Sequence, residues 1–184
     1  MGETDQVLVA KVRAGNHSAF RILVERWSRS VFRVAFRMTG NESDAEDIAQ
    51  ETFLKAYRQL DHYESRAAFG TWIYRIAVNC SLDLLRVRDR HCVAELPEIT
   101  STAPAPDRLA LSGEFRDRLG RALELLSHQE RAAFLLRHYE GLPIEEIAQA
   151  LELSGTATKN SIFRAVQKLR VELQPLCNTS TKKN

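Results

Sequence analysis

Helical periodicity runs through almost the whole chain, and this pattern decides which folds are open to it. Apolar residues recur at the spacing of an amphipathic helix, and no segment alternates as a half-buried strand would. The spacing predicts helices near residues 4–14, 17–38, 44–60, 67–90, 108–125, 128–139, 144–151 and 157–173. The fold class that follows is all-α.

The helical pattern fails between residues 93 and 107, where Pro97, Pro104 and Pro106 lie among serine and threonine. Proline removes a backbone donor and disrupts a helix interior, and this composition favours a flexible tether. We therefore expect two small helical domains joined by a flexible Pro-rich linker. The expected divisions are a domain at 1–92, the linker at 93–107, a domain at 108–176 and a disordered tail at 177–184.

Short signals also place several helix ends. Three glycines stand where helices should stop, because glycine adopts the left-handed conformation of a C-cap without strain: Gly15, Gly40 and Gly141. Two Ser-x-x-Glu patterns precede strong helical runs and predict capping boxes, at Ser43–Glu46 and at Ser127–Glu130.

The 184 residues are 44% hydrophobic and 27% charged, as is usual in a soluble globular protein. No apolar run reaches the roughly 20 residues that span a bilayer, and the N-terminus lacks the features of a signal peptide. We expect a cytoplasmic protein without membrane insertion. The net charge is only +2, but acidic and basic residues are segregated along the chain, which suggests different partners for different faces.

The cysteines give no sign of a disulfide framework or a metal site. Cys80, Cys92 and Cys177 are odd in number and widely spaced, and Cys80 falls on an apolar helix face, where we expect it in the core. His91 adjoins Cys92 without a further ligand pair, so we expect neither a metal nor a cofactor. Because no nucleophile–base spacing or phosphate loop stands out, we do not expect an enzyme.

The predicted helix 44–60 has an apolar side and a charged side. The apolar side holds Ala45, Ala49, Phe53, Ala56 and Leu60, and the other side holds Asp47, Glu51, Leu54 and Arg58. A leucine surrounded by charge is typical of a docking surface for another protein. The alternative is a solvated helix face, since single exposed leucines are common.

The predicted helix 67–90 combines a buried stripe with a polar face. The stripe holds Phe69, Ile73, Ile76, Ala77, Cys80 and Leu84, the opposite face holds Arg75, Asn79, Leu82 and Arg86, and Trp72 lies on the border. Tyr63 and Arg66 stand in the preceding loop. Arginine can hold phosphates, asparagine can read a base edge, and border aromatics can stack on an unpaired base. We interpret this segment as a single-stranded DNA surface; ordinary core aromatics are the alternative.

Near the C-terminus, the segment 144–173 has the pattern of a helix-turn-helix. Ile144, Ile147, Ala148 and Leu151 share one face of a short helix, the turn ELSGT follows, and Ile162, Val166, Leu169 and Leu173 share the inner face of a longer helix. The outer face suits a major groove. Arg164 is the natural guanine reader, Asn160 and Gln167 can address adenine, and Lys159 and Lys168 suit phosphates. The alternative is a helical hairpin in a structural bundle.

Together these segments resemble the extracytoplasmic-function (group IV) sigma factors of bacterial RNA polymerase. The stretches that carry the resemblance are DAEDIAQETFLKAYRQLD, FGTWIYRIAVNCSLDLLR, LSHQERAAFLLRHYEGLPIEEIAQAL and IFRAVQKLR. They occur in the family's order, with the Pro-rich tether between the second and the third, and the resemblance covers residues 5–176.

The resemblance implies roles for the N-terminal domain. It would dock the clamp helices of the polymerase's largest subunit through positions that match Asp47, Gln50, Glu51 and Leu54. It would also recognise and open the promoter −10 element. The loop Tyr63–Phe69, which includes Arg66, corresponds to the loop that captures a flipped base, and Trp72, Arg75 and Asn79 match the helix that faces the element.

The C-terminal domain would bind the −35 element as duplex and would meet the flap of the second-largest subunit. The matching recognition-helix positions are Lys159, Asn160, Ser161, Phe163 and Arg164, with Lys168 as a further phosphate contact. Family members are commonly held inactive by an anti-sigma factor between the two domains, and a flexible tether suits such clamping.

Four residues depart from the family's pattern. Glu152 replaces a glycine in the helix-turn-helix turn, Ser161 an arginine of the recognition helix, Gly70 an arginine before Thr71-Trp72, and Val78 an arginine before Asn79. We expect these changes to reduce DNA contacts, and so to favour an atypical promoter or a greater dependence on polymerase.

Three other functions compete with a sigma factor. A response-regulator output domain shares the helix-turn-helix pattern, but its receiver domain would alternate strands and helices before residue 93. A small helical enzyme or metal protein would use His91, Cys92 or Cys177. A degenerate relative would bind polymerase without reading DNA, which the departures at Gly70, Val78 and Ser161 would suit.

Overall fold

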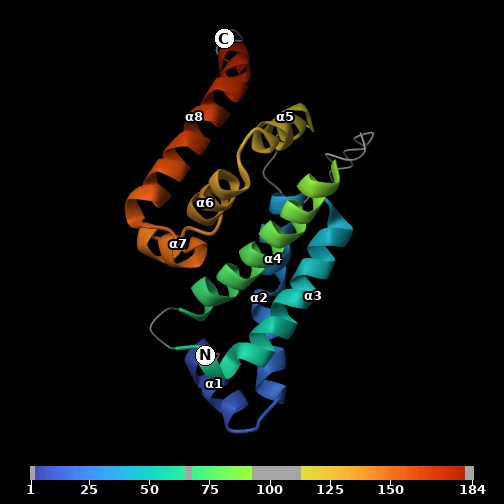
Figure 1. The fold of residues 1–184 in the computed structure, drawn as a ribbon, viewed down its shortest axis with the longest axis vertical. Coiled ribbons are helices and arrows are strands. Elements are labelled where there is room, and N and C mark those ends of the chain that lie inside the picture. Colours follow the sequence, from blue (N-terminus) through green and yellow to red (C-terminus); the bar gives the residue numbers. More distant parts are fainter. Residues whose placement is uncertain (1–2, 65–67, 93–112, 181–184) are drawn as a thin grey trace.

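A computed structural model describes residues 3–64, 68–92 and 113–180. In chain order its helices are α1 Asp5–Arg13, α2 Ser18–Thr39, α3 Glu42–Gln59, a 3₁₀ turn Leu60–His62, α4 Phe69–Cys92, α5 Gly113–Glu124, α6 His128–His138, α7 Ile144–Leu151 and α8 Gly155–Ser180 (Figure 1). These described segments contain no strand, so the predicted all-α class is confirmed. The linker 93–107, Arg66 and residues 181–184 lie outside the described residues.

Helix α8 is longer than the sequence predicts at both ends. It starts at Gly155 because the Ser154 hydroxyl caps it, accepting a hydrogen bond from the Ala157 amide at 3.1 Å. It continues to Ser180, so residues 177–180 are helical where the sequence predicts a disordered tail. The predicted C-terminal end was the last residue of the apolar stripe. The backbone stays helical beyond it, because no glycine follows to end the helix.

The predicted helix ends are mostly confirmed. Gly15, Gly40 and Gly141 all have positive φ angles, and Gly40 caps α2 at φ +71°. Ser127 and Glu130 form the predicted capping box, with bonds of 3.2 and 3.0 Å to each other's backbone amides. The box predicted at Ser43–Glu46 is wrong.

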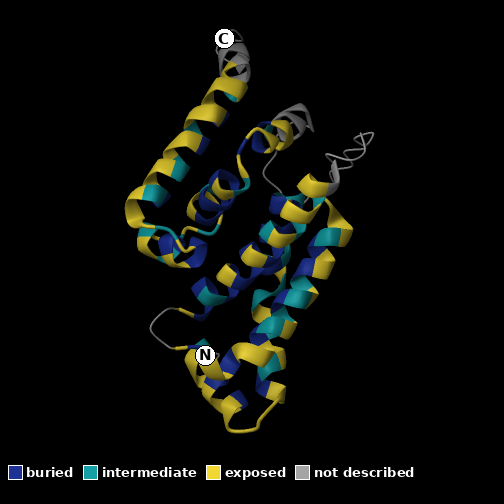
Figure 2. Cartoon of the chain, in the orientation of Figure 1, coloured by how far each residue is buried: buried dark blue, intermediate teal, exposed yellow. Residues whose placement is uncertain are grey.

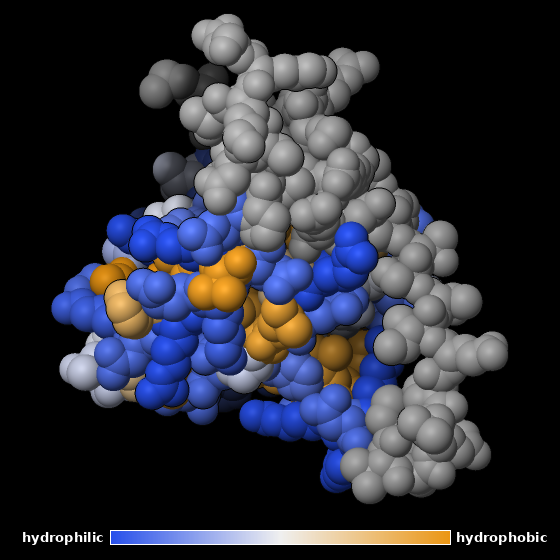
Figure 3. All heavy atoms as spheres, turned by 90° about the horizontal axis from the view of Figure 1, so that it is seen from above, coloured by the Kyte–Doolittle hydropathy of each residue, from blue (hydrophilic) through white to orange (hydrophobic). Residues whose placement is uncertain are grey.

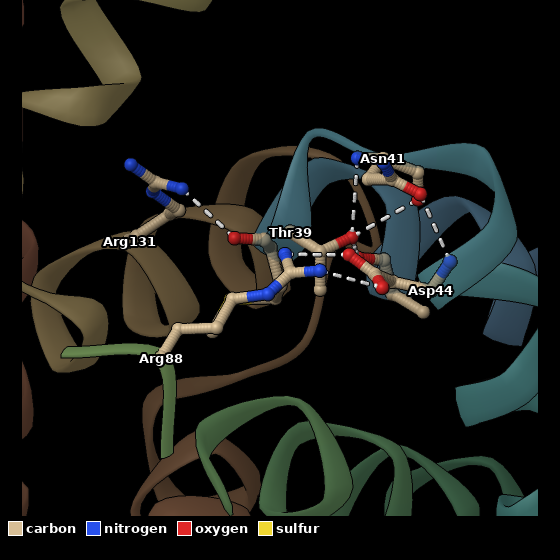
Figure 4. A network of polar contacts seen from close by, with 7 residues as sticks. Thr39, Asn41, Asp44, Arg88 and Arg131 are labelled. Atoms are coloured by element: carbon tan, nitrogen blue, oxygen red, sulfur yellow. Dashed lines mark hydrogen bonds and ion pairs between the residues drawn. The ribbon is translucent and has the colours of Figure 1, made fainter. Parts of the chain in front are cut away.

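Helix α3 is capped two residues earlier, by Asn41. Its side-chain oxygen accepts from the Asp44 amide at 3.1 Å, because the chain turns extended directly after the left-handed Gly40. Figure 4 shows how this corner is held: Arg88 of α4 makes a two-point ion pair with Asp44, at 2.6 and 2.7 Å. Arg131 of α6 donates to the Met38 carbonyl at the end of α2, at 2.8 Å. The corner therefore joins four helices, α2, α3, α4 and α6.

The N-terminal domain buries the inner faces of α1, α2, α3 and α4 against one another (Figures 1 and 2). Its centre includes Leu8, Leu23, Val31, Ala45, Ile48, Ala56, Ile73 and Ala77, each 5% exposed or less. The predicted apolar side of α3 is confirmed at Ala45, Ala56 and Leu60. Cys80 is buried as predicted, at 7% exposed.

The C-terminal domain consists of α5 to α8. Its own apolar cluster joins α5 to α8 through Ala122, Leu123, Leu126, Ala165 and Leu169. Glu130 of the α6 capping box also receives the Lys168 ammonium of α8, at 2.7 Å. Burial alone would raise the pKa of Glu130, but Lys168 and the bonds with Ser127 outweigh it and lower that pKa.

The two domains lie against each other and share an apolar cluster. Helix α7 packs on α4, and α6 packs on α2 (Figure 1). The N-terminal domain contributes Val34, Met38, Tyr74, Val78 and Leu85, and the C-terminal domain contributes Ala132, Ala133, Leu135, Leu136, Ile147, Ala150 and Leu151. The sequence predicts two domains and a tether but not this shared core.

No helix in the described part of the chain combines the length and apolar character that crossing a membrane requires. Seen from above, the surface of the described residues is mainly hydrophilic, with small separate apolar patches (Figure 3).

Gly70 is required by the packing of Trp27, which lies against Phe69 and edge-on to Tyr74. A Cβ atom at Gly70 would overlap the Trp27 ring. The absence of a side chain at Gly70 therefore makes room for the Trp27 ring.

We expect Gly70→Ala to lower the free energy of unfolding by about 1–3 kcal/mol, because the ring must leave its position to admit the methyl group. Denaturant unfolding measures the change. The matched control is Gly120→Ala, on α5, where a Cβ meets nothing within 4 Å; it should stabilise the chain by roughly 0.5–1 kcal/mol. Equal effects of the two substitutions would contradict this account of Gly70.

Candidate functional site

The outer face of α3 carries the residues that the sequence predicts for protein docking. Asp47 and Gln50 are exposed, and Leu54 is 51% exposed although it is a large apolar side chain. Glu51 is half-buried and pairs with Lys55 at 3.5 Å, one turn along the helix. The structure therefore brings these side chains to one solvent-facing surface, as the helical periodicity predicts.

A shallow groove of about 330 Å³ runs beside this surface, between α3 and α4. Ile48, Leu84 and Val87 line it with apolar atoms, and Asp47 and Asp83 are among the acidic residues that line it. The acidic character suits a partner that combines basic and apolar side chains.

At the base of this groove the Lys55 ammonium lies 3.4 Å from the Cys80 sulfur. Burial alone would lower the pKa of Lys55, but Cys80 and Glu51 outweigh it and raise that pKa. Lys55 thus stays charged and holds α3 to α4.

The aromatic residues before and within α4 form a cluster. Tyr63 and Phe69 are each 2% exposed, and their rings meet edge-on at 5.7 Å between centroids. Trp72 is half-buried, with its ring 5.0 Å from Tyr63 and 5.6 Å from Phe69. The sequence predicts DNA contacts for all three, but Tyr63 and Phe69 lie in the core because they fill the space between α1, α2 and α4. Only Trp72 has a surface that a base could reach.

Arg13 of α1 fixes the chain that leads into this cluster. Its guanidinium donates to the carbonyls of Leu60 and Tyr63, at 2.7 and 2.5 Å. The loop residues 65–67, which include the predicted contact Arg66, lie outside the described residues. The start of the loop is thus anchored to α1.

On α4, Arg75 and Asn79 are exposed one turn apart, on the face that the sequence predicts. Arg75 is not free: its guanidinium pairs with Glu152 of the helix-turn-helix turn at 2.5 Å. Val78, beside Asn79, is fully buried in the cluster shared between the domains. Val78 therefore contributes to the packing between the domains.

The helix-turn-helix is formed by α7, a turn at Glu152–Ser154 and α8. Glu152 has φ +54°, a left-handed conformation that glycine adopts with less strain. Thr158 is fully buried and donates to the Ser154 carbonyl at 3.0 Å, which secures the start of α8.

Most residues that the sequence predicts on the outer face of α8 are exposed to solvent. Lys159, Asn160 and Arg164 are exposed, and Phe163 is 63% exposed. Ser161 is half-buried. A large apolar side chain beside polar donors can touch a thymine methyl group while they bond base edges.

Lys168, predicted as a phosphate contact, is held by Glu130. This ion pair joins α8 to α6 and helps to hold the C-terminal domain together. No spacing within α8 signals this contact, because Glu130 lies on a different helix.

Sequence reasoning missed the residues that join the domains, notably Glu140. They come from separate parts of the chain, so no periodicity within one helix relates them. Among the described residues, no group of three or more histidine, cysteine, aspartate or glutamate side chains could hold a metal ion. The side chains of His91, Cys92 and Cys177 lie outside this description.

Two protein families match the chain in order: Sigma-70 region 2 over residues 23–91 and Sigma-70 region 4 over residues 116–169. These matches coincide with α2–α4 and with α5–α8, the two domains of the structure.

Curated relatives match almost end to end. The chain is 35% identical to the ECF RNA polymerase sigma-E factor of Escherichia coli K12, over 94% of this chain and 96% of that protein. It is 33% identical to the RNA polymerase sigma-H factor of Pseudomonas aeruginosa, over 95% of this chain and 96% of that protein.

Two solved structures share the fold over most of the chain. CnrH in complex with the cytosolic domain of CnrY superimposes with a TM-score of 0.71 and 27% identity, over 94% of this chain and 99% of CnrH. The sigma factor RpoE of Bartonella quintana, in complex with the anti-sigma factor NepR, gives a TM-score of 0.72 and 22% identity, over 84% and 96% of the two chains. With both regions present in order and relatives matched along nearly their whole length, this chain belongs to the extracytoplasmic-function sigma factors of the sigma-70 family.

Proposed function

We propose that this chain binds core RNA polymerase, directs it to specific promoters and helps to open the −10 element. The observation that carries the proposal is the presence, on one chain, of an exposed docking helix and a helix-turn-helix with an open outer face. The first can hold polymerase and the second can read duplex DNA. Neither task requires catalysis by the chain itself, and its place of work would be the cytoplasm.

For polymerase binding, the proposed surface consists of Asp47, Gln50, Glu51 and Leu54 on α3, against the clamp helices of the largest subunit. An exposed leucine ringed by polar groups supports this assignment, because such residues anchor protein interfaces. The flap of the second-largest subunit would meet the C-terminal domain.

For DNA binding, the proposed −10 contacts are Trp72, Arg75 and Asn79. Tyr63 and Phe69 act by holding Trp72 in place, and Arg66 stays a sequence prediction. The proposed −35 contacts are Lys159, Asn160, Ser161, Phe163 and Arg164. The complexes of CnrH and RpoE suggest that an anti-sigma factor also regulates this chain.

The function is tested by transcription from a pooled library of randomised −35 and −10 sequences, with core polymerase and with or without this chain. We expect chain-dependent transcripts that share one promoter motif. Binding to core without any transcript would point to a polymerase-binding antagonist, and no binding to core would contradict the proposal.

Leu54→Ala should weaken binding to core polymerase by about 10-fold or more, as expected when a central apolar anchor of an interface is removed. The measurement is a titration of labelled full-length chain with core enzyme. Val7→Ala is the control, because Val7 is a comparably exposed apolar residue (44%) on α1, away from α3. If both variants bind like the wild type, α3 is not the docking surface.

Ser161→Arg should strengthen binding to a −35 duplex by roughly 10-fold, because an arginine at a base-facing position can make a bidentate contact with guanine. Competition binding of the full-length chain to the selected promoter duplex measures the change. Gln174→Arg adds the same charge farther along α8, at an exposed position, and controls for non-specific attraction. An unchanged affinity for Ser161→Arg would count against this assignment of the recognition helix.

A further inference from the structure

Arg13, the last residue of α1, is bound to backbone that lies 47 to 50 residues farther along the chain. Its guanidinium donates to the carbonyl of Leu60 at 2.7 and 3.2 Å, to that of Asp61 at 3.2 Å and to that of Tyr63 at 2.5 Å. These carbonyls belong to the segment that follows α3, beside α1 (Figure 1). A single side chain therefore holds three carbonyls of one short segment.

The chemistry of a helix end explains why an arginine suits this place. The last carbonyls of a helix have no amide partner within it, and they carry the negative end of the helix dipole. A guanidinium presents several donors in a fixed planar fork, so it can satisfy several carbonyls at once, whereas an ammonium is a compact point charge. Arg13 thus completes the hydrogen bonding of this segment and also supplies a positive charge there.

The segment that Arg13 holds supports the aromatic cluster before α4. Tyr63 lies at the end of that segment, and its side chain is only 2% exposed. The Trp72 ring packs on the Tyr63 ring, at 5.0 Å between centroids, and is itself half-buried. A shift of the Tyr63 backbone would therefore move the support of the ring that is proposed to stack on a −10 base.

Helix α1 is firmly placed and can act as a fixed support. Its inner side packs in the core of the N-terminal domain through Leu8, Val9 and Val12, each 7% exposed or less. Near its start, Asp5 accepts from the Trp27 indole at 3.1 Å, and the Trp27 ring lies 6.3 Å from that of Phe69. Helix α1 thus reaches the aromatic cluster from both of its ends, through Trp27 and through Arg13.

We propose that Arg13 is a positioning residue for −10 recognition. By fixing the carbonyls of Leu60, Asp61 and Tyr63, it holds the Tyr63 ring against Trp72, so that Trp72 can stack on an unpaired base. Stacking needs the ring in one position, and a binding group keeps its position only when its supporting residues are themselves held.

This inference rests on the proposed function, since it concerns the same −10 surface. It assigns a role to α1, which precedes the residues 23–91 that match Sigma-70 region 2. Arg13 makes no contact with DNA in this role and acts through Tyr63 and Trp72.

The test measures binding of holoenzyme, assembled from core polymerase and full-length chain, to a single-stranded oligonucleotide with the −10 sequence selected from the library. A second set of oligonucleotides lacks one base at a time, and the loss of affinity at each position is the penalty for that base. Trp72→Ala should abolish the penalty at one position, which identifies the stacked base. If Trp72→Ala leaves every penalty unchanged, Trp72 stacks on no base and the proposal fails.

Arg13→Ala should weaken binding to the intact oligonucleotide by roughly 5- to 20-fold, in the range of one lost base–aromatic stack. It should also nearly abolish the penalty at the position that depends on Trp72. Lys11→Ala is the matched control, because it removes a cation from the same helix, but one that pairs with Glu3; its affinity should stay within about 2-fold of the wild type. Weaker binding by Arg13→Ala with an unchanged penalty, or unchanged binding, would overturn the proposal.

Arg13→Lys keeps the charge and gives a second reading that does not depend on the fold of Arg13→Ala. Because lysine lacks the planar fork, its penalty should lie between those of the wild type and Arg13→Ala. Binding to core polymerase and to the −35 duplex should be unchanged in both variants. Loss of these two activities as well would mean that Arg13 serves the fold as a whole, and would contradict a positioning role.

Transcription by wild-type holoenzyme separates this inference from the proposed function. If the wild type directs transcription but Arg13→Ala keeps the wild-type penalty, only the role of Arg13 is wrong. If wild-type holoenzyme binds no −10 oligonucleotide and yields no transcript, the proposed function has failed, and the role of Arg13 fails with it.

Discussion

The fold depends on burying α4 on two sides at once. One side packs against α2 and α3, where Ile73 and Ala77 are fully buried, and another packs against α7 through Val78. A helix enclosed in this way has only a narrow strip left for solvent, and on that strip lie Arg75 and Asn79. The burial that stabilises the molecule therefore also decides which α4 side chains a ligand can reach.

Much of this architecture could be predicted from the sequence, because the helices are strongly amphipathic. The positions of α2, α3, α6 and α7 follow from apolar spacing and terminal signals such as Gly40 and the Ser127–Glu130 box. The exposed face of α3 that carries Leu54 also followed, since Leu54 interrupts an otherwise charged stripe. The spacing of apolar residues was less informative at the ends of α8, where the helix extends beyond its apolar face.

The remaining features are tertiary and leave no periodic trace. Tyr63 and Phe69 carry the residue types of a base-stacking site, but burial is decided by neighbours from α1 and α2 that composition does not reveal. Lys168 is basic and lies on the recognition helix, yet it forms an ion pair with Glu130 on another helix. The residue types at Gly70, Val78 and Glu152 are explained by their neighbours in space. Gly70 lies against Trp27, Val78 packs on α7, and Glu152 pairs with Arg75.

The two domains are parts of one chain, with residues 93–112 leading from α4 to α5. Because the domains are linked covalently, each stays near the other, at an effective concentration of the order of millimolar. An interface that would be too weak to form between separate molecules can then be mostly occupied within one. A competitor could still separate the domains, because no covalent bond joins their faces, but it would have to offset the exposure of the shared apolar cluster. The shared apolar cluster and the ion pairs beside it can therefore hold the domains together without making their contact permanent.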